Sequence, residues 1–379
     1  MPSNILKNIN IALMVFLLVA GILFLPVLYL FQGSLSTLEG EVSLAGIKAP
    51  LSILRDAQGV PTIKASNRDD TAYALGFLHG QERFFQMDLL RRTSAGELSA
   101  LFGKRAVRHD KKIRLHQFRK RATDAFENMP PVHQKILSHY TMGVNQGLEA
   151  LGQLPFEYFL LQGQAQPWQV QDSLLVLYSM YIDLQPIWGQ SERSLAVMKD
   201  LLPKDWFTFL TSQGGYWDSP IEGNPYIENK DLPIKPLHFF QEKNTSQNNA
   251  SVNTGKIYYG SNYKDEIHYG SNNWSVSGAL TSHGAGMVAN DMHLGLGVPN
   301  IWYRASWYLE DGRRITGVSL PGTPAMIAGS NERVAWGFTN SQGDYSDVII
   351  LKTREPNQYL TPQGWQEFII ESEKIQVRK

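Results

Sequence analysis

The sequence predicts a protein of the α+β class, because helical and strand-like patterns occupy different parts of the chain. Apolar residues recur at helical spacing in three stretches, residues 71–102, 132–151 and 172–201. From Trp274 onward, short apolar runs alternate with turn residues, which is typical of an antiparallel β-rich domain. Two more strand-like runs flank a turn within residues 51–65. A run of helices followed by a run of strands favours α+β.

Composition narrows the classes of function. The 379 residues are 43% hydrophobic, which is enough for a large core and excludes a wholly disordered chain. Lys plus Arg and Asp plus Glu both number 35, so the net charge gives no general attraction to nucleic acid. A basic run at residues 104–121 carries no nucleic-acid-binding motif and favours a solvated or headgroup-facing helix surface. There is no cysteine, which excludes disulfides, thiolate nucleophiles and zinc-finger or iron–sulfur ligation.

The N-terminal segment, residues 1–34, predicts where the protein resides. Residues 11–31 carry no charge and reach the roughly 20 apolar residues that cross a bilayer. We therefore expect a transmembrane anchor, with a cleaved secretory signal and a buried core helix as alternatives. Lys7 on the short N-terminal side agrees with the positive-inside rule. Either of the first two alternatives puts the rest of the chain in the periplasm or otherwise outside the cytoplasm. We expect the protein to be anchored to the inner membrane.

A polar segment separates the two halves of the chain. Residues 241–273 are rich in Asn, Ser and Gly and show no hydrophobic periodicity. Such a segment buries too little apolar surface to order itself. It is interpreted as an exposed linker or an excised spacer.

Most catalytic motifs are absent or occur out of context. Ser261 begins an S-x-x-K match, but it lies in the polar segment and its companion motifs are missing. No G-x-S-x-G nucleophile elbow, H-E-x-x-H zinc motif or complete dinucleotide-binding glycine loop occurs. No organic cofactor is expected.

The Gly270–Ser271 step remains as a candidate. If the chain were cut before Ser271, the freed α-amine would have a pKa near ~8 and could accept the proton of the serine hydroxyl. Nucleophile and base would then belong to one residue, as in N-terminal-nucleophile catalysis. A Gly–Ser step alone is common in proteins and does not establish this chemistry.

The neighbouring sequence carries a resemblance to a known family. SNNWSVSG begins at Ser271, ANDMHLGLGVPNIWY at Ala289 and SLPGTPAMIAGSNERVAWGFTNSQGDYSDV at Ser319. Earlier, YALGFLHGQERFFQMDLLRR begins at Tyr73. In these blocks the chain resembles the penicillin acylase family of N-terminal-nucleophile hydrolases. The resemblance implies a four-layer αββα sandwich with a helical α-chain at residues 35–240, a spacer at residues 241–270 and a β-chain from residue 271.

The resemblance also implies roles for individual residues in the reaction. Cleavage between Gly270 and Ser271 would make Ser271 the nucleophile and, through its α-amine, the general base. His293 matches a histidine that many family members place beside the nucleophile; a purely structural histidine is the alternative. The backbone N–H of Asn340 matches an oxyanion-hole donor, with Thr339 as the neighbouring alternative.

A calcium site is implied as well. Asp344, Asp347 and the Ser346 carbonyl match ligands of the family's β-chain, and Glu192 matches the ligand of its α-chain. Oxygen donors of this kind suit Ca²⁺. Asp344 and Asp347 as plain turn residues are the alternative.

Substrate preference is predicted from the residues that match the family's acyl pocket. Met180, Leu294, Ile327 and Ala328 match its walls, and Leu294 and Ala328 replace phenylalanines of phenylacetyl-specific members. A wider, aliphatic pocket follows, suited to acyl amides such as acyl-homoserine lactones or the side chains of β-lactam antibiotics. The predicted reaction is hydrolysis of a linear amide.

The extent of the chain and its assembly form a last set of expectations. The resemblance implies a β-chain longer than residues 271–379, so the sequence is expected to be the front part of a precursor, truncated within the β-chain and inactive alone. The mature partners would be an α-chain and a β-chain in one heterodimer. The rival hypothesis is a membrane-anchored, acylase-like scaffold or binding protein that never matures.

Overall fold

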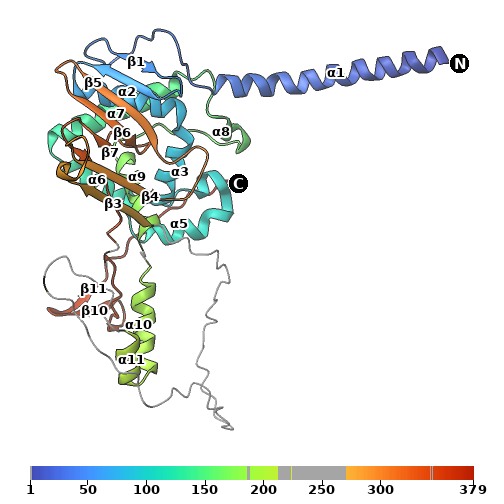
Figure 1. Cartoon of the computed structure of the whole chain (residues 1–379). Helices are drawn as coiled ribbons and strands as arrows, with labels where there is room; N and C mark the ends of the chain where they lie inside the picture. Colours follow the sequence, from blue (N-terminus) through green and yellow to red (C-terminus); the bar gives the residue numbers. More distant parts are fainter. Residues whose placement is uncertain (1, 186–187, 212–222, 224–269, 342, 344) are drawn as a thin grey trace. The chain divides into compact units, whose positions relative to one another are not determined.

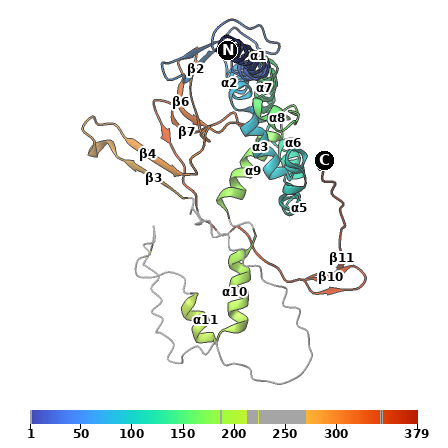
Figure 2. The ribbon, with the colours of Figure 1, turned by 90° about the vertical axis from the view of Figure 1, so that its right-hand side faces the viewer.

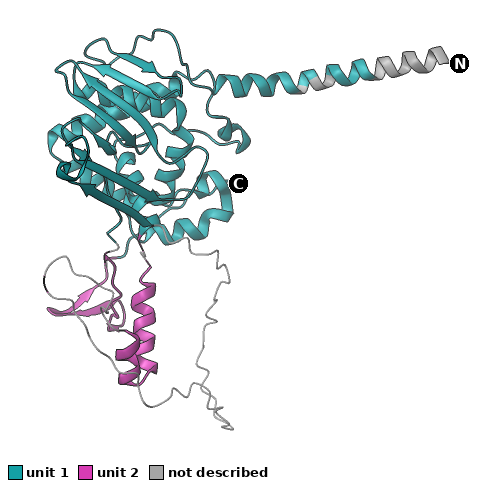
Figure 3. Cartoon of the chain, viewed as in Figure 1, with its two compact units in different colours: residues 1–184, 269–341, 370–379 teal, residues 185–268, 342–369 magenta. Residues whose placement is uncertain are grey.

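The computed structural model describes residues 2–185, 188–211, 223, 270–341, 343 and 345–379. The chain divides into two compact units (Figures 1 and 3). Unit 1 comprises residues 1–184, 269–341 and 370–379, and unit 2 comprises residues 185–268 and 342–369. The predicted spacer, residues 241–270, lies outside the described residues except for Gly270.

Unit 1 contains both helices and strands, which confirms the predicted α+β class. Its helices are α1 (Pro2–Gly33), α2 (Arg68–Glu82), α3 (Phe84–Ala95), α4 (Ser99–Phe102), η1 (Gly103–Ala106), α5 (Val107–Arg114), α6 (Phe118–Glu127), α7 (Pro131–Glu149), α8 (Phe156–Leu160), α9 (Asp172–Leu184) and η2 (Gly278–Leu280). Its strands are β1 (Ser52–Arg55), β2 (Pro61–Ala65), β3 (Gly270–Val276), β4 (Met287–His293), β5 (Tyr303–Leu309), β6 (Arg314–Ser319), β7 (Met326–Ser330) and β8 (Ala335–Trp336).

Six of these strands form one sheet in the order β1-β2-β5-β6-β7-β8, with helices against one side of it (Figure 2). The strands expected after Trp274 pair antiparallel with one another, and β5 to β8 share their sheet with β1 and β2 from the N-terminal half of the chain. Strand β2, which precedes all the packed helices in sequence, pairs in parallel with β5, from Thr62↔Ser306 to Ala65↔Leu309. Its central Ile63 is fully buried and anchors this edge of the sheet in the core. Strands β3 and β4 form a separate two-stranded hairpin.

Helices α2 and α7 cross in direct backbone contact. A Cβ added at Gly76 of α2 would lie 2.2 Å from the Tyr140 carbonyl oxygen, and one at Gly143 of α7 would lie 2.0 Å from the Tyr73 carbonyl oxygen. Because each glycine faces the backbone of the other helix, no side chain can be accommodated there without moving the helices apart.

A buried hydrogen-bonded chain joins these helices to the sheet. His79 Nδ1 lies 2.7 Å from the Tyr140 hydroxyl, and His79 Nε2 lies 3.1 Å from Ser319 Oγ on β6. The Tyr140 hydroxyl also accepts the backbone N–H of Gly322 at 2.9 Å. Complete burial, with Arg83 nearby, lowers the pKa of His79 to about 3, so the imidazole is neutral.

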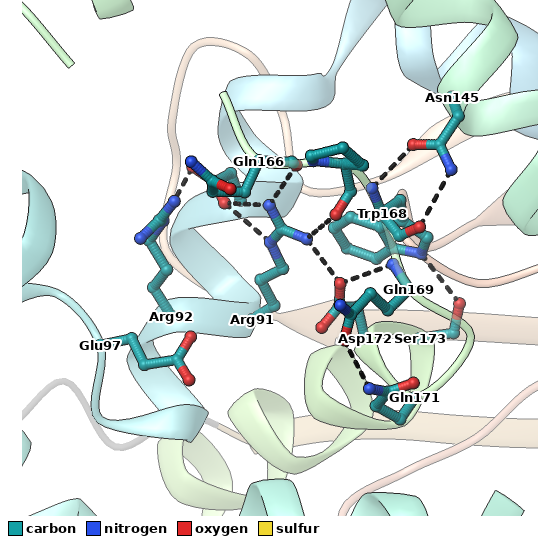
Figure 4. A network of polar contacts seen from close by, with 12 residues as sticks. Arg91, Arg92, Glu97, Asn145, Gln166, Trp168, Gln169, Gln171, Asp172 and Ser173 are labelled. Carbon is teal, nitrogen blue, oxygen red and sulfur yellow. Dashed lines mark hydrogen bonds and ion pairs between the residues drawn. The ribbon is translucent and has the colours of Figure 1, made fainter. Parts of the chain in front are cut away.

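A second buried network carries full charges. Asp88 on α3 accepts hydrogen bonds from Arg91 Nε at 2.7 Å, Arg92 Nε at 2.9 Å and the Tyr158 hydroxyl at 2.7 Å. Figure 4 shows the Arg91 guanidinium pointing toward Asp172, its second carboxylate partner, and toward Gln166, whose carbonyl it also reaches. This network ties α3 to the start of α9 and to the turn before it.

Two predicted helical stretches are interrupted. Residues 71–102 contain, besides the expected break near Gly96, a second break at Arg83, whose φ of −136° ends α2. Residues 172–201 form two helices, α9 and α10 (Gln190–Leu201), and Gly189, which immediately precedes α10, is left-handed at φ 58°.

Predicted strands also differ from the structure. Among the strand-like runs expected after Trp274, the one at residues 334–339 is reduced to β8, and those at residues 347–352 and 374–379 form no strand. Exposed apolar side chains, Ile349 at 78% and Ile350 at 89%, explain the second case, since no core surface stabilises that run as a strand.

Unit 2 contains the remaining elements. They are α10, α11 (Lys204–Leu210), β9 (Thr353–Arg354), β10 (Gln358–Thr361) and β11 (Gly364–Glu367), with the strands ordered β11-β10-β9. Tyr359 stacks on Phe368, at 4.7 Å between ring centroids, beside this small sheet.

At the N-terminus, α1 coincides with the predicted apolar segment. Its last carbonyl, that of Gly33, accepts the backbone N–H of Gln153 at 2.8 Å. Among the residues that the structure describes, no helix combines the length and apolarity needed to cross a membrane. The anchor therefore stays a prediction.

Candidate active site

Ser271 lies at the start of the β3–β4 hairpin. The register pairs Gly270 with His293 and Ser271 with Met292. The turn beyond β3 is tight, because a Cβ at Gly278 would lie 2.3 Å from the Gly284 carbonyl oxygen. The hairpin therefore has a fixed register that places Ser271 near its open end.

The segment after β8 brings hydrogen-bonding groups to Ser271. The backbone N–H of Asn340 donates to Ser271 Oγ at 2.8 Å, across 69 residues of sequence. Thr339 Oγ1 lies 2.9 Å from the same Oγ and donates to the Ser271 carbonyl oxygen at 2.8 Å. The sequence left the backbone donor open between Asn340 and Thr339, and it is the backbone N–H of Asn340 that donates to Ser271 Oγ.

Asn290 holds this segment to the hairpin, and the sequence analysis missed it. Its Nδ2 donates to the Phe338 carbonyl at 2.9 Å and to the Asn272 carbonyl at 3.2 Å, and its Oδ1 accepts the Phe338 N–H at 3.2 Å. A Cβ at Gly337 would lie 2.7 Å from Asn290 Oδ1, so this approach requires glycine. The alternation of side chains along a strand could have indicated Asn290. It lies two residues before Met292, the partner of Ser271, and so shares a face of β4 with it.

His293 is close to the Gly270–Ser271 bond but does not share a face with the Ser271 side chain. Its Nδ1 lies 3.8 Å from the position that a Cβ would take at Gly270. Because directly paired residues share a face and neighbours alternate, His293 lies on the opposite face of the hairpin from Ser271. Its Nε2 contacts Asp291 Oδ2 at 3.0 Å, a partner that sequence reasoning also missed. The role expected of His293 stays a prediction.

The residues expected to form the acyl pocket lie on three elements. Met180 on α9 and Ile327 on β7 both pack against the hydrophobic core, and Ala328 is 8% exposed. Ser319 pairs with Met326 and Val318 with Ala328, so Ile327 is the extra residue of a β-bulge. Bulges re-aim side chains and are frequent beside active sites. Leu294 is half-buried just after β4, where its N–H donates to the Met292 carbonyl at 3.0 Å.

One cavity of unit 1 lies near this predicted pocket without including its residues. It has a volume of about 420 Å³ and borders β7 and β8, where Met326 and Trp336 line it. None of its lining residues is one of the four expected pocket residues.

The residues expected to bind calcium fall in unit 2. Glu192 lies in the first turn of α10, and its Oε2 is 3.3 Å from the position of a Cβ at Gly189. Val348 Cγ2 is 2.5 Å from the same position. Glu192 and Val348, which follows Asp347 in sequence, therefore both lie beside Gly189. Asp347 Oδ1 accepts the Val348 N–H at 2.7 Å.

The residues expected to bind calcium offer oxygen donors, the ligand type that this ion prefers. Asp344 lies outside the described residues, and within the described ones no group of three His, Asp or Glu side chains is arranged to hold a metal. Two carboxylates and the Ser346 carbonyl are hard oxygen donors, which fit Ca²⁺.

A strand-borne serine whose Oγ meets a backbone N–H is an arrangement that nucleophilic acyl-transfer chemistry can use. The model of the penicillin amidase family matches residues 50–379. The chain belongs to this family, which confirms the resemblance noted from its motifs.

Several relatives are similar over most of the chain. Penicillin acylase 2 proenzyme of Pseudomonas sp. (strain SE83) is 29% identical over 86% of this chain and 40% of its own length. Acyl-homoserine lactone acylase QuiP of Pseudomonas aeruginosa is 26% identical over 89% of this chain and 39% of its own. The chain thus spans about two fifths of the length of these curated relatives.

Among solved structures, the thermostable penicillin G acylase from Alcaligenes faecalis is similar at a TM-score of 0.39 and 20% identity. The match covers 46% of this chain and 98% of that chain.

Proposed function

We propose that the full-length protein is an amidohydrolase that cleaves N-acyl amides of small molecules through a Ser271 acyl-enzyme. The proposal is carried by one observation, the contact between Ser271 Oγ and the Asn340 N–H at 2.8 Å. Membership of the penicillin amidase family supports it. So do relatives named penicillin acylase and acyl-homoserine lactone acylase.

Maturation would come first. Ser271 Oγ attacks the Gly270 carbonyl carbon, the C–N bond breaks and the hydroxyl proton ends on the new α-amine. Water then hydrolyses the Gly270 ester, leaving a Gly270 carboxylate and Ser271 with a free amine of pKa near ~8. The cut would yield an α-chain and a β-chain in one heterodimer.

Turnover uses the same atoms. The α-amine accepts the Ser271 hydroxyl proton as Oγ attacks the substrate amide carbon, and the leaving amine receives that proton. Once Oγ has bonded to the substrate carbon, the Asn340 N–H that contacts Ser271 Oγ in the structure would donate to the adjacent oxyanion, a contact worth roughly 3–4 kcal/mol in the transition state. Water then releases the carboxylic acid from Oγ.

The proposed substrates are aliphatic acyl amides. Met180, Leu294, Ile327 and Ala328 would form the acyl site, and an acyl-homoserine lactone or a β-lactam side chain is the proposed kind of substrate. Comparing hydrolysis of phenylacetyl and medium-chain anilides tests this preference, because a strong preference for phenylacetyl contradicts it.

Calcium and location complete the proposal. Glu192, Asp344, Ser346 and Asp347 would hold a structural Ca²⁺ that joins the α- and β-chains, and the protein would act outside the cytoplasm. Chelation followed by thermal denaturation tests the metal: a melting temperature unchanged by chelator argues against it.

The decisive experiment is intact mass and N-terminal sequencing of the purified full-length protein. We expect a chain beginning Ser-Asn-Asn-Trp in the wild type and none in Ser271→Ala. Ser275→Ala, a change on the same strand, is the matched control and should be cut normally. A wild type that stays uncut would favour the non-maturing scaffold.

A further inference from the structure

The side chain of Thr339 contacts the candidate nucleophile at two atoms. Thr339 Oγ1 lies 2.9 Å from Ser271 Oγ and 2.8 Å from the Ser271 carbonyl oxygen. The next residue, Asn340, reaches the same Oγ through its backbone N–H. Thr339 is exposed, so these contacts are not explained by packing in the core.

The direction of each hydrogen bond follows from what its atoms can donate. A carbonyl oxygen only accepts, so the single hydroxyl proton of Thr339 goes to the Ser271 carbonyl. The Ser271 hydroxyl proton then points at Thr339 Oγ1, while Ser271 Oγ accepts the Asn340 N–H. These contacts engage the proton and one lone pair of the serine hydroxyl. Its second lone pair is the one left for attack on a carbonyl carbon.

We infer that Thr339 is a positioning residue that holds Ser271 Oγ in the orientation needed for attack; this inference rests on the proposed function. In self-cleavage Oγ bonds to the Gly270 carbonyl carbon, the C–N bond to Ser271 breaks and the hydroxyl proton ends on the released amine. Thr339 forms no bond and keeps its own proton. After the cut, Ser271 has one covalent restraint fewer, so its two contacts with Thr339 carry more of its positioning.

The test compares variants of Thr339 in the full-length protein. Thr339→Val keeps the shape of the side chain and removes both hydrogen bonds, so we expect cleavage at Gly270–Ser271 to slow roughly 10²-fold. Thr339→Ser restores the hydroxyl and should cleave within a few-fold of wild type. The time course of conversion, followed by intact mass, gives the rates.

Thr316→Val is the matched control. Thr316 Oγ1 lies 3.0 Å from Ser306 Oγ, an exposed Thr–Ser pair between β6 and β5. Removing that hydroxyl should leave the cleavage rate unchanged. In cut protein, Thr339→Val should lower kcat and leave KM near the wild-type value, a split that a general loss of structure would not produce.

Two results would overturn the inference. One is cleavage of Thr339→Val at the wild-type rate, and the other is Thr339→Ser as slow as Thr339→Val. If Thr339→Val is recovered only as aggregate, Thr339→Ala, which adds no bulk, replaces it in the same comparison. A wild type that is never cut instead defeats the proposed function, and the inference with it.

Discussion

The buried charge network around Asp88 and the hairpin that carries Ser271 place polar groups in opposite surroundings. Asp88 and Asp172 are 0% and 1% exposed, and both carboxylates contact Arg91. Thr339 is exposed and Ser271 is half-buried. They are joined by hydrogen bonds between Thr339 Oγ1 and both the hydroxyl and the carbonyl oxygen of Ser271. Buried charges are tolerated only when their partners are complete, so the network commits α3 and α9 to one arrangement. Substitutions in the β3–β4 hairpin are therefore expected to alter the reactivity of Ser271 without unfolding the helices and sheet of unit 1.

The largest effect is expected from Asp88→Ala. It leaves Arg91 and Arg92 without their shared acceptor in the core, so we expect the free energy of unfolding to fall by about 3–5 kcal/mol. Urea denaturation measures it. The control is Asp311→Ala, whose exposed pair with Arg313 should contribute little. If the free energy of unfolding falls by less than about 1 kcal/mol in Asp88→Ala, the buried charge network does not stabilise the fold.

Gly143→Ala should have the next largest effect. The added Cβ meets the Tyr73 carbonyl at 2.0 Å, and relief requires α2 and α7 to separate, at a cost of about 1–3 kcal/mol. Thermal denaturation provides the measurement. Gly21→Ala, in α1 with nothing within 4 Å of the new Cβ, is the control and should not lower the melting temperature. Equal melting temperatures for both variants would contradict the close helix contact.

Low pH should lower the free energy of unfolding through His79, which lies on α2 and is buried against α7 and β6. Its pKa of about 3 in the folded state is below the unfolded value of 6.5, so between these values only the unfolded chain binds the proton. Stability is retained above pH 6.5 and falls as pH decreases below it, by up to about 1.4 kcal/mol per pH unit from this residue. Denaturation between pH 7 and pH 5 should show a smaller pH slope in His79→Asn than in wild type. Identical slopes would argue against a neutral, buried His79.

The smallest effect on stability is expected from Asn290→Ala, although its effect on maturation should be clear. It frees residues 337–338 from the hairpin and so loosens the Asn340 donor, while losing only about 1 kcal/mol of stability. Asn331→Ala, which removes an amide that accepts the Val334 N–H at 2.7 Å, is the control. Both should melt alike, and only Asn290→Ala should cleave slowly. Equal cleavage rates would remove Asn290 from the site.

Local patterns predicted elements better than they predicted pairings. The helical spacing of residues 132–151 gives α7 almost to the residue, whereas the break at Arg83 has no proline or glycine to announce it. The parallel partner of β2 lies far along the chain, and no local signal specifies it. For the candidate site, the motifs pointed to Ser271 and Asn340, which the structure brings together at 2.8 Å. The contacts of Asn290 and Thr339 depend on how the hairpin meets the segment after β8, which becomes evident only in three dimensions.

The parallel pairing of β2 with β5 has a consequence for the protein after cleavage at Gly270–Ser271. The cut would assign β1 and β2 to one polypeptide and β5 to β8 to the other, yet the ladder from Thr62↔Ser306 to Ala65↔Leu309 would still join them. Unfolding of the cut protein would then yield two separate polypeptides, whereas unfolding of the uncut chain yields one. The melting temperature of the cut protein should rise with its concentration, and its refolding should become second order.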